Sequence, residues 1–108
     1  CYADWCESER AALRATGLEA LETLADRLLS RRQYRRAIQA LQRALTLEPA
    51  REVFHRQLMR AYALSGQRSR ALAQYKRCEE NLRLELDAPP SRRTLELYQK
   101  IMTEAPLD

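Results

Sequence analysis

The sequence predicts an all-α fold: a right-handed solenoid of about five helices, paired into antiparallel hairpins, with a long first helix. Three observations indicate this fold. The 108 residues include 18 Leu and 16 Ala but only one Val and two Ile, a composition that favours helices and contains few of the residues that favour a β-sheet. Apolar residues recur three or four positions apart along most of the chain. The chemistry of the chain also repeats after 34 residues.

The first helix is expected from about Ala3 to Ser30. Gly17 lies inside it, at a cost of about 1 kcal/mol relative to Ala. The apolar stripe continues through this glycine, so we predict one long helix that can bend there. The stripe comprises Cys6, Leu13, Gly17, Leu21, Leu24 and Leu28, flanked by Ala20 and Ala25.

The second helix is expected from Gln33 to Leu47, because Pro49 pushes the residue before it out of the helical region. The third is expected from Arg51 to Ser65, where Gly66 suits a left-handed cap. Their apolar faces are Tyr34, Ala37, Ile38, Leu41, Ala44 and Leu45 in the second helix, and Phe54, Leu58, Met59, Tyr62 and Ala63 in the third.

The fourth helix is expected from Ser69 to Leu84 and is followed by a rigid loop at residues 87–90. Ser91 is a natural N-cap for the fifth helix. The connections are short, so neighbouring helices should be antiparallel. The apolar faces are Ala71, Leu72, Tyr75, Cys78 and Leu82 in the fourth helix, and Leu95, Tyr98, Ile101 and Met102 in the fifth.

The 34-residue repeat decides the predicted architecture. It aligns Leu24 with Leu58, Ala37 with Ala71, and Ala44 with Cys78. A helix–turn–helix unit of this length is the tetratricopeptide repeat. We therefore predict a single domain over residues 1–108, with repeat one at 18–51, repeat two at 52–85 and a capping helix at 91–104. Arg32 stands at a turn where Gly or Asn is common, so the first turn is expected to differ in shape from the second.

Five short motifs follow one another along the chain. They are Asp4–Arg10 with its Trp-x-x-x-x-Arg spacing, Glu48–Glu52 followed by Leu58–Tyr62, Gly66-Gln67 followed by Ala71–Tyr75, Leu82–Ser91 with its closing Pro-Pro-Ser, and Leu97-Tyr98. In this order and spacing they resemble the bacterial transcriptional activator domain (BTAD), a tetratricopeptide-like domain of SARP-type and related transcriptional regulators. Asp87 stands where that family has Gly. Asp tolerates the left-handed conformation better than most residues, so the loop should keep its shape.

The resemblance implies a non-enzymatic protein-interaction and regulatory module. Such a module would mediate oligomerisation, or transmit a signal to a DNA-binding domain outside this chain, and that separate domain would contact the DNA. The chain begins at Cys1 rather than Met and lacks the helices that usually precede the Trp motif, so we expect a fragment of a longer regulator. The alternative is a free-standing tetratricopeptide adaptor that binds a peptide or partner protein in its concave groove.

Direct DNA contact through arginine clusters is a third interpretation. The net charge is +4, and 17 of the 19 basic residues are Arg. Arg and Glu are interspersed along the helices, however, which is typical of an ordinary solvated surface. The charge therefore favours a protein partner over nucleic acid.

No residue pattern points to catalysis, a cofactor or a metal. The single histidine, His55, has Leu58 and Met59 at i+3 and i+4, so it has no second ligand on its helix. We expect a packed or edge histidine. A glycine-rich phosphate loop is absent from the sequence.

The cysteines indicate a reduced, cytoplasmic protein. Cys1, Cys6 and Cys78 form no Cys-x-x-Cys pair, and an odd count is no disulfide framework. Cys78 replaces Ala44 of the first repeat, so we expect it to be a small core residue. No run of 18 apolar residues is present to span a membrane.

The repeat register predicts a groove on the concave face, because the first helix of each hairpin lines that face. One wall would be acidic and the facing wall basic. The residues expected there are Glu19, Glu22 and Asp26 on one wall, and Val53, Arg56 and Arg60 on the other. They either pair with each other across the groove or hold a peptide or another protein segment.

A second surface is expected in the first half of the first helix. Tyr2, Trp5, Cys6 and Leu13 have no hairpin partner in this sequence. We expect an apolar patch there that favours self-association, such as a homodimer.

Overall fold

The computed structural model describes residues 17–107. The N-terminal helix is described over residues 17–30, and it is followed by α2 (Tyr34–Leu47), α3 (Glu52–Leu64), α4 (Arg68–Leu86) and α5 (Arg92–Met102). The described residues contain no strand, which confirms the all-α prediction. The predicted first helix before Gly17 lies outside the described residues. Every other helix end lies within two residues of its predicted position.

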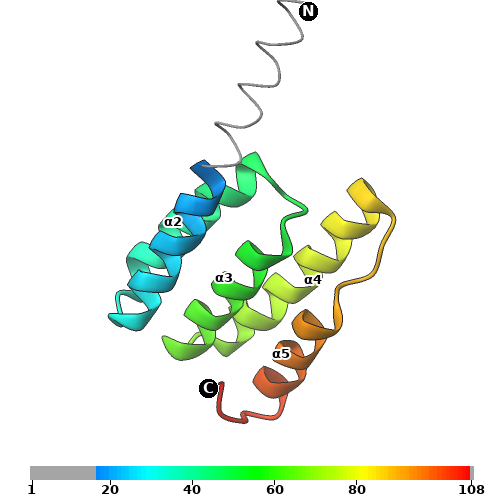
Figure 1. Cartoon of the computed structure of the whole chain (residues 1–108). Helices are drawn as coiled ribbons and strands as arrows, with labels where there is room; N and C mark the ends of the chain where they lie inside the picture. The colour runs from blue at the N-terminus through cyan, green and yellow to red at the C-terminus, as the bar shows by residue number, and fades with distance from the viewer. Residues whose placement is uncertain (1–16, 108) are drawn as a thin grey trace, which may run out of the picture.

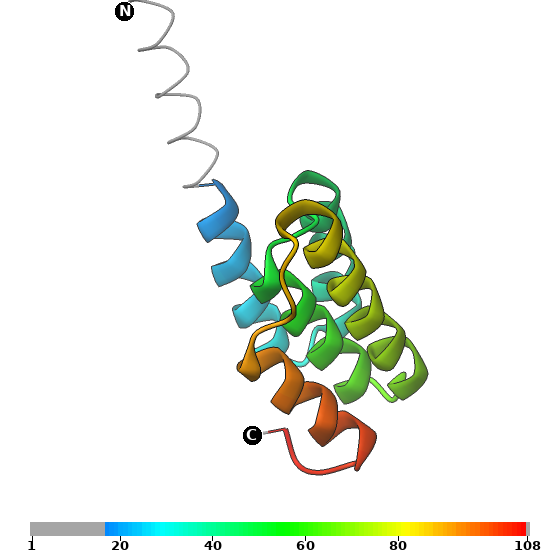
Figure 2. The ribbon, with the colours of Figure 1, turned by 90° about the vertical axis from the view of Figure 1, so that its right-hand side faces the viewer.

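The helices form two layers (Figures 1 and 2). The N-terminal helix, α3 and α5 make one layer, and α2 and α4 make the other. Helix α3 contacts α2, α4 and α5, so it is the central helix. Its residues are buried on most sides: Phe54, His55, Gln57, Leu58, Met59, Ala61 and Tyr62.

Small residues recur where helices of a hairpin approach each other. Ala37 and Ala71, 34 positions apart, are both fully buried, and so are Ala44 and Cys78. A small side chain at these points lets the backbones come close, while large residues such as Leu41 fill the space between hairpins. The small residues that recur every 34 positions in the sequence therefore occupy equivalent buried places in the two hairpins.

The two hairpin turns have the same backbone shape. Arg32 has φ 60° and Gly66 has φ 82°, both in the left-handed region. The amide of each donates to the carbonyl three residues earlier, at 3.1 and 3.2 Å. The amides of Gln33 and Gln67 donate to the carbonyl five residues earlier, at 2.8 and 2.7 Å. The expectation of a different first turn is wrong, because these paired hydrogen bonds hold Arg32 in a conformation that costs a non-glycine residue about 1–2 kcal/mol.

Both ends of α5 are held by side chains of other helices. Glu52, at the start of α3, accepts hydrogen bonds from the Ser91 amide (2.9 Å) and the Thr94 hydroxyl (2.6 Å). Arg68, the first residue of α4, donates to the carbonyl oxygens of the last turn, at 2.9 Å to that of Ile101. A carboxylate at the N-terminus and a guanidinium at the C-terminus both complement the helix dipole.

The buried stripe of the N-terminal helix differs from the predicted one. Leu24 is 46% exposed, so its assignment to the apolar face is wrong, and so is that of the exposed Ala20. Leu18 is buried instead, Ala25 is buried as expected of a residue flanking the stripe, and Leu21 packs against the same core. The small Ala25, rather than Leu24, therefore faces the core.

The buried face of helix α5 also differs from the predicted one. Leu95 and Met102, which we expected on its apolar face, are 40% and 46% exposed. Thr94, Leu97 and Ile101 are buried. The hydroxyl of Thr94 contacts the partly buried Glu52 and Arg56 of α3, so a polar residue takes a place on the inward face of α5.

The loop before α5 keeps the shape expected of it. Asp87 adopts the left-handed conformation, with φ 49° and ψ 45°, and its amide donates to the carbonyl of Arg83. Within residues 17–107, no helix is long and apolar enough to cross a membrane.

Candidate functional site

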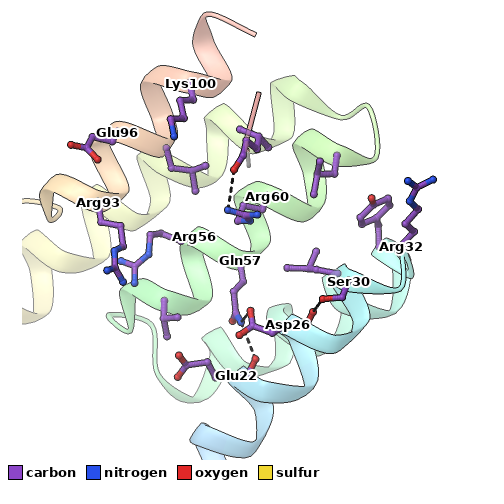
Figure 3. Close-up of a pocket in the computed structure, with 16 residues that line it drawn as sticks. Glu22, Asp26, Ser30, Arg32, Arg56, Gln57, Arg60, Arg93, Glu96 and Lys100 are labelled. Atoms are coloured by element: carbon purple, nitrogen blue, oxygen red, sulfur yellow. Dashed lines mark hydrogen bonds between the residues drawn. The ribbon is translucent and has the colours of Figure 1, made fainter. Parts of the chain in front are cut away.

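A cavity of about 790 Å³ opens on the layer formed by the N-terminal helix, α3 and α5 (Figure 3). We call it the concave groove and define it by its lining residues. From the N-terminal helix to α2 they are Glu22, Asp26, Leu29, Ser30, Arg32 and Tyr34; from α3 they are Val53, Arg56, Gln57, Arg60 and Leu64; and from α5 onward they are Arg93, Glu96, Leu97, Lys100 and Leu107.

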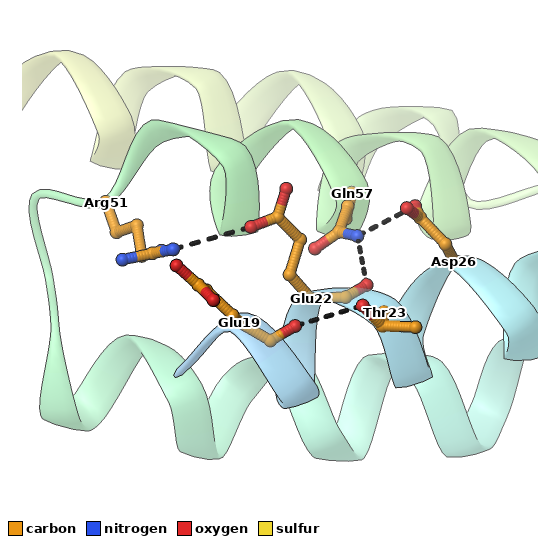
Figure 4. A network of polar contacts seen from close by, with 6 residues as sticks. All are labelled: Glu19, Glu22, Thr23, Asp26, Arg51 and Gln57. Atoms are coloured by element: carbon orange, nitrogen blue, oxygen red, sulfur yellow. Dashed lines mark hydrogen bonds and ion pairs between the residues drawn. The ribbon is translucent and has the colours of Figure 1, made fainter. Parts of the chain in front are cut away.

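The acidic side of the groove belongs to the N-terminal helix. Gln57 of α3 is 4% exposed, and its amide nitrogen donates to the main-chain oxygen of Glu22 (2.9 Å) and to Oδ1 of Asp26 (2.8 Å). These two bonds, drawn in Figure 4, join the acidic wall to the central helix. Asp26 thus faces the groove with one oxygen already occupied.

The carboxylate of Glu22 is also paired. Arg51, just before α3, lies 3.4 Å from its Oε2, and the Arg51 guanidinium sits 5.3 Å above the centre of the Phe54 ring. Figure 4 shows Glu19 beside Arg51, at the end of this network. Glu19 is exposed and does not line the groove.

The basic side of the groove belongs to α3 and α5. Arg56 donates to the Thr94 hydroxyl at 3.1 Å and lies 3.8 Å from Glu52. Figure 3 shows Arg93 pointing toward Arg56, with Lys100 further along α5. Among residues 17–107, the side chains of Arg93 and Lys100 make no hydrogen bond or ion pair. The unmatched charge of the groove is therefore positive.

The network of Glu52 and Thr94 fixes the basic side. Thr94 is fully buried, and its hydroxyl donates to Glu52 while it accepts from Arg56. Burial alone would raise the pKa of Glu52, but hydrogen bonds from Thr94 and Ser91, with the charge of Arg56, lower it below its usual value. This carboxylate stays ionised at neutral pH and anchors α5 to α3.

The segment after α5 enters the groove from its other end. The Arg60 guanidinium donates to the main-chain oxygen of Leu107 at 3.4 Å (Figure 3). The Leu107 side chain lines the groove and packs against the hydrophobic core.

His55 is a structural residue, as expected. It is 1% exposed, and its Nε2 lies 2.6 Å from the main-chain oxygen of Pro49 while its Nδ1 lies 2.8 Å from Nε2 of Gln74. A neutral ring fits both contacts, with Nε2–H donating and Nδ1 accepting. Burial lowers the pKa of His55, which favours that neutral form. The ring ties the loop before α3 to α4.

The cysteine within the described residues is also structural. Cys78 is fully buried, and burial raises the pKa of its thiol to about 12. A thiol in that state is a poor nucleophile. Residues 17–107 contain no group of three His, Cys, Asp or Glu side chains that could hold a metal ion.

The predicted site residues are distributed as follows. Glu22, Asp26, Val53, Arg56 and Arg60 all line the groove. Arg56 and Arg60 bind neither Glu22 nor Asp26 directly; their partners among the described residues lie on α3, on α5 and in the segment after it. The predicted self-association patch, Tyr2, Trp5, Cys6 and Leu13, lies outside the described residues.

Sequence reasoning missed the third wall of the groove. Arg93, Glu96 and Lys100 reach it only because α5 packs beside α3. Their spacing of three and four residues puts them on one helical face, which is the signal that could have found them.

The comparisons with known proteins agree with this architecture. A family model described as the bacterial transcriptional activator domain matches residues 2–102. Among solved structures, the chain is similar to EmbR from Mycobacterium tuberculosis in complex with a low-affinity phosphopeptide, with 28% sequence identity and a TM-score of 0.91. The similarity covers 97% of this chain and 28% of that one, so this chain spans little more than a quarter of EmbR. A search of the curated proteins found no match.

The family model covers nearly the whole chain, and the structural match shows the same helical, tetratricopeptide-like fold. The chain belongs to the bacterial transcriptional activator domain family and is a non-enzymatic regulatory domain of the kind that bacterial transcriptional regulators carry.

Proposed function

We propose that this domain transmits a signal to a DNA-binding domain outside this chain by holding a segment of a partner protein in its concave groove. The observation that carries the proposal is the groove itself. It is built from three helices of one layer, and its polar side chains are held in place from behind by Gln57 and Thr94. Preorganised polar groups lower the cost of binding an extended segment.

The family supports the regulatory part of this proposal, and the geometry supports the groove. EmbR was solved with a phosphopeptide, so one regulator with a similar domain binds a protein segment. The match spans 28% of that chain and gives the phosphopeptide no position on this domain. The groove therefore rests on the contacts described above.

The test is a paired charge reversal in the regulator that carries this chain. Arg60→Glu with Arg93→Glu changes two groove cations whose side chains make at most one weak hydrogen bond within residues 17–107. We expect the promoter output of the regulator to lose its response to the signal. Helix content by circular dichroism and promoter binding in a gel shift should stay unchanged.

The matched control is Arg43→Glu with Arg77→Glu. Both are exposed residues of the outer layer, and the pair changes the net charge by the same amount. The control should respond as the unmodified regulator does. A regulator that responds normally with both groove residues reversed would refute the role of the groove.

We also propose that the domain self-associates through Tyr2, Trp5, Cys6 and Leu13. The support is the sequence: these apolar side chains have no hairpin partner in the repeat pattern. Sedimentation equilibrium should show a mass that rises with concentration, and Trp5→Ser should lower it. A monomer at every concentration whose Trp5 fluorescence is already that of a buried ring contradicts this proposal.

A further inference from the structure

The groove already contains an extended segment of its own chain. After α5 ends at Met102, Glu104 turns the backbone with φ 58°, and the Ala105 amide donates to the carbonyl of Lys100 at 2.9 Å. Pro106 biases the residue before it toward an extended conformation. Leu107 then packs into the groove. Residues 105–107 are called the strap below.

The hold on the strap is slight. Within the described residues, its last anchor is the single hydrogen bond from Arg60 to the Leu107 carbonyl, at 3.4 Å, together with the half-buried Leu107 side chain. A bond of that length is near the limit of the geometry. The strap therefore contacts the rest of the groove through one long hydrogen bond and one half-buried leucine.

The charge of the groove indicates what would replace it. Its lining includes five cations, Arg32, Arg56, Arg60, Arg93 and Lys100, and three carboxylates, Glu22, Asp26 and Glu96. Each carboxylate has a partner on the protein: Arg51, Gln57 and Arg92 respectively. Arg93 and Lys100 have none within residues 17–107, and Arg60 keeps donors to spare beyond its bond to the strap.

We propose that the concave groove takes an extended acidic segment of a partner protein, which pairs with Arg60, Arg93 and Lys100 and displaces Leu107 of the strap. This inference rests on the proposed function and names the class of segment. Displacement releases residues 105–107 from the groove, so binding of the partner segment changes the position of these residues.

A protein segment fits this groove better than a nucleic acid does. Duplex DNA carries one negative charge per about 1.7 Å. Phosphates at that density would lie close to Glu22, Asp26 and Glu96, on both sides of the groove, and these carboxylates would repel them. An acidic peptide can place a few carboxylates on the basic side and neutral residues beside the acidic wall.

The experiment uses the 108-residue chain and three fluorescein-labelled decapeptides. The first has four Glu around a Pro-Leu pair, the second has Gln in place of each Glu, and the third has Lys. Fluorescence anisotropy should show the acidic peptide binding at least about tenfold more tightly than the neutral one, with an affinity that falls as salt rises. The basic peptide should bind no better than the neutral one.

Two variants assign the residues. Arg93→Glu with Lys100→Glu should lower the affinity of the chain for the acidic peptide at least about tenfold. The matched control, Lys76→Glu with Arg77→Glu on the exposed face of α4, should change this affinity less than about twofold.

A 20-base-pair DNA duplex is the further probe, and it should bind the chain more weakly than the acidic peptide does.

A third variant tests the strap. Leu107→Ala removes the competing side chain. It should raise the affinity for the acidic peptide about three- to tenfold, because the groove is then free of the strap more often. Leu84→Ala, on an exposed leucine of α4, should leave the affinity unchanged. The amide resonance of Leu107 should shift on peptide addition in the unmodified chain.

Several outcomes would overturn the inference. These are equal binding of the neutral and acidic peptides, no effect of the α5 reversal, an unchanged or weaker affinity in Leu107→Ala, or tighter binding of the duplex through the same residues. These outcomes would not refute the proposed function, which is tested separately by the promoter response, because that response depends on the groove whatever segment occupies it.

Discussion

Replacing Thr94 by Val should destabilise the domain by about 2 kcal/mol, because it removes a hydrogen bond to a charged group at a buried site. The hydroxyl donates to Glu52 at 2.6 Å and accepts from Arg56 at 3.1 Å, and the residue is fully buried. Val keeps the shape of Thr, so no cavity forms. Thr94→Ser is the matched control: it keeps the hydroxyl and loses one buried methyl group, at a cost of about 1 kcal/mol.

The assay is urea unfolding followed by circular dichroism at pH 7, with the free energy of unfolding taken from the midpoint and slope. In a thermal scan, about 2 kcal/mol corresponds to a loss of roughly 8–16 °C for a domain of this size. A Val variant as stable as the Ser variant would refute the reasoning.

The pH dependence gives a second check on the same contact. The folded-state pKa of Glu52 lies below its usual value of 4.5, so this carboxylate adds stability that is present above pH 4.5 and is lost as the pH falls through the folded pKa. Without the Thr94 hydroxyl the pKa should return toward the usual value. The stability gap between the unmodified chain and Thr94→Val should therefore shrink as the pH falls below 4.5, and a constant gap between pH 7 and pH 3 contradicts the assignment.

Three further predictions concern buried groups and turns. Burial lowers the pKa of His55, so stability should be full above pH 6.5 and should fall below it; His55→Leu should abolish this part of the pH dependence in urea titrations. Gly66→Ala should cost about 1 kcal/mol of unfolding free energy because of its left-handed backbone, and Arg32→Gly, at the equivalent turn, should stabilise by a similar amount; equal effects of the same sign would contradict this. The thiol of Cys78, whose pKa is raised to about 12, should resist iodoacetamide at pH 8 in the native chain and react after unfolding, as read by peptide mass mapping.

The helices and their order could be predicted from local sequence. Pro49 ends α2 and Gly66 ends α3, and both act through backbone geometry that does not depend on distant residues. Ser91 stands at the N-cap position of α5, but its side chain makes no capping hydrogen bond and its amide is held by Glu52, 39 residues away. The 34-residue repeat added the pairing of helices into hairpins. It also predicted five groove residues, because equivalent positions in successive hairpins face the same way.

The rotation of the outer helices could not be predicted in this way. Leu24 and Leu95 fit an apolar stripe as well as Leu18 and Leu97 do, and sequence periodicity does not distinguish neighbouring positions on a wide apolar face. Tertiary contacts decided between them. Ala25 is buried in the first helix, and Thr94 is buried in α5 with its hydroxyl bonded to Glu52, whereas Leu24 and Leu95 are exposed.

By itself the sequence determined an all-α repeat domain with an acidic wall facing a basic one, since composition, periodicity and repeat length are local properties. Only the tertiary structure showed that the acidic wall is already paired, by Arg51 and Gln57, and that Arg93 and Lys100 bring unmatched positive charge from a third helix. The physical reason is that ion pairs and hydrogen bonds depend on distances of a few ångströms between residues 29 and 31 positions apart, and these distances exist only once the hairpins have packed.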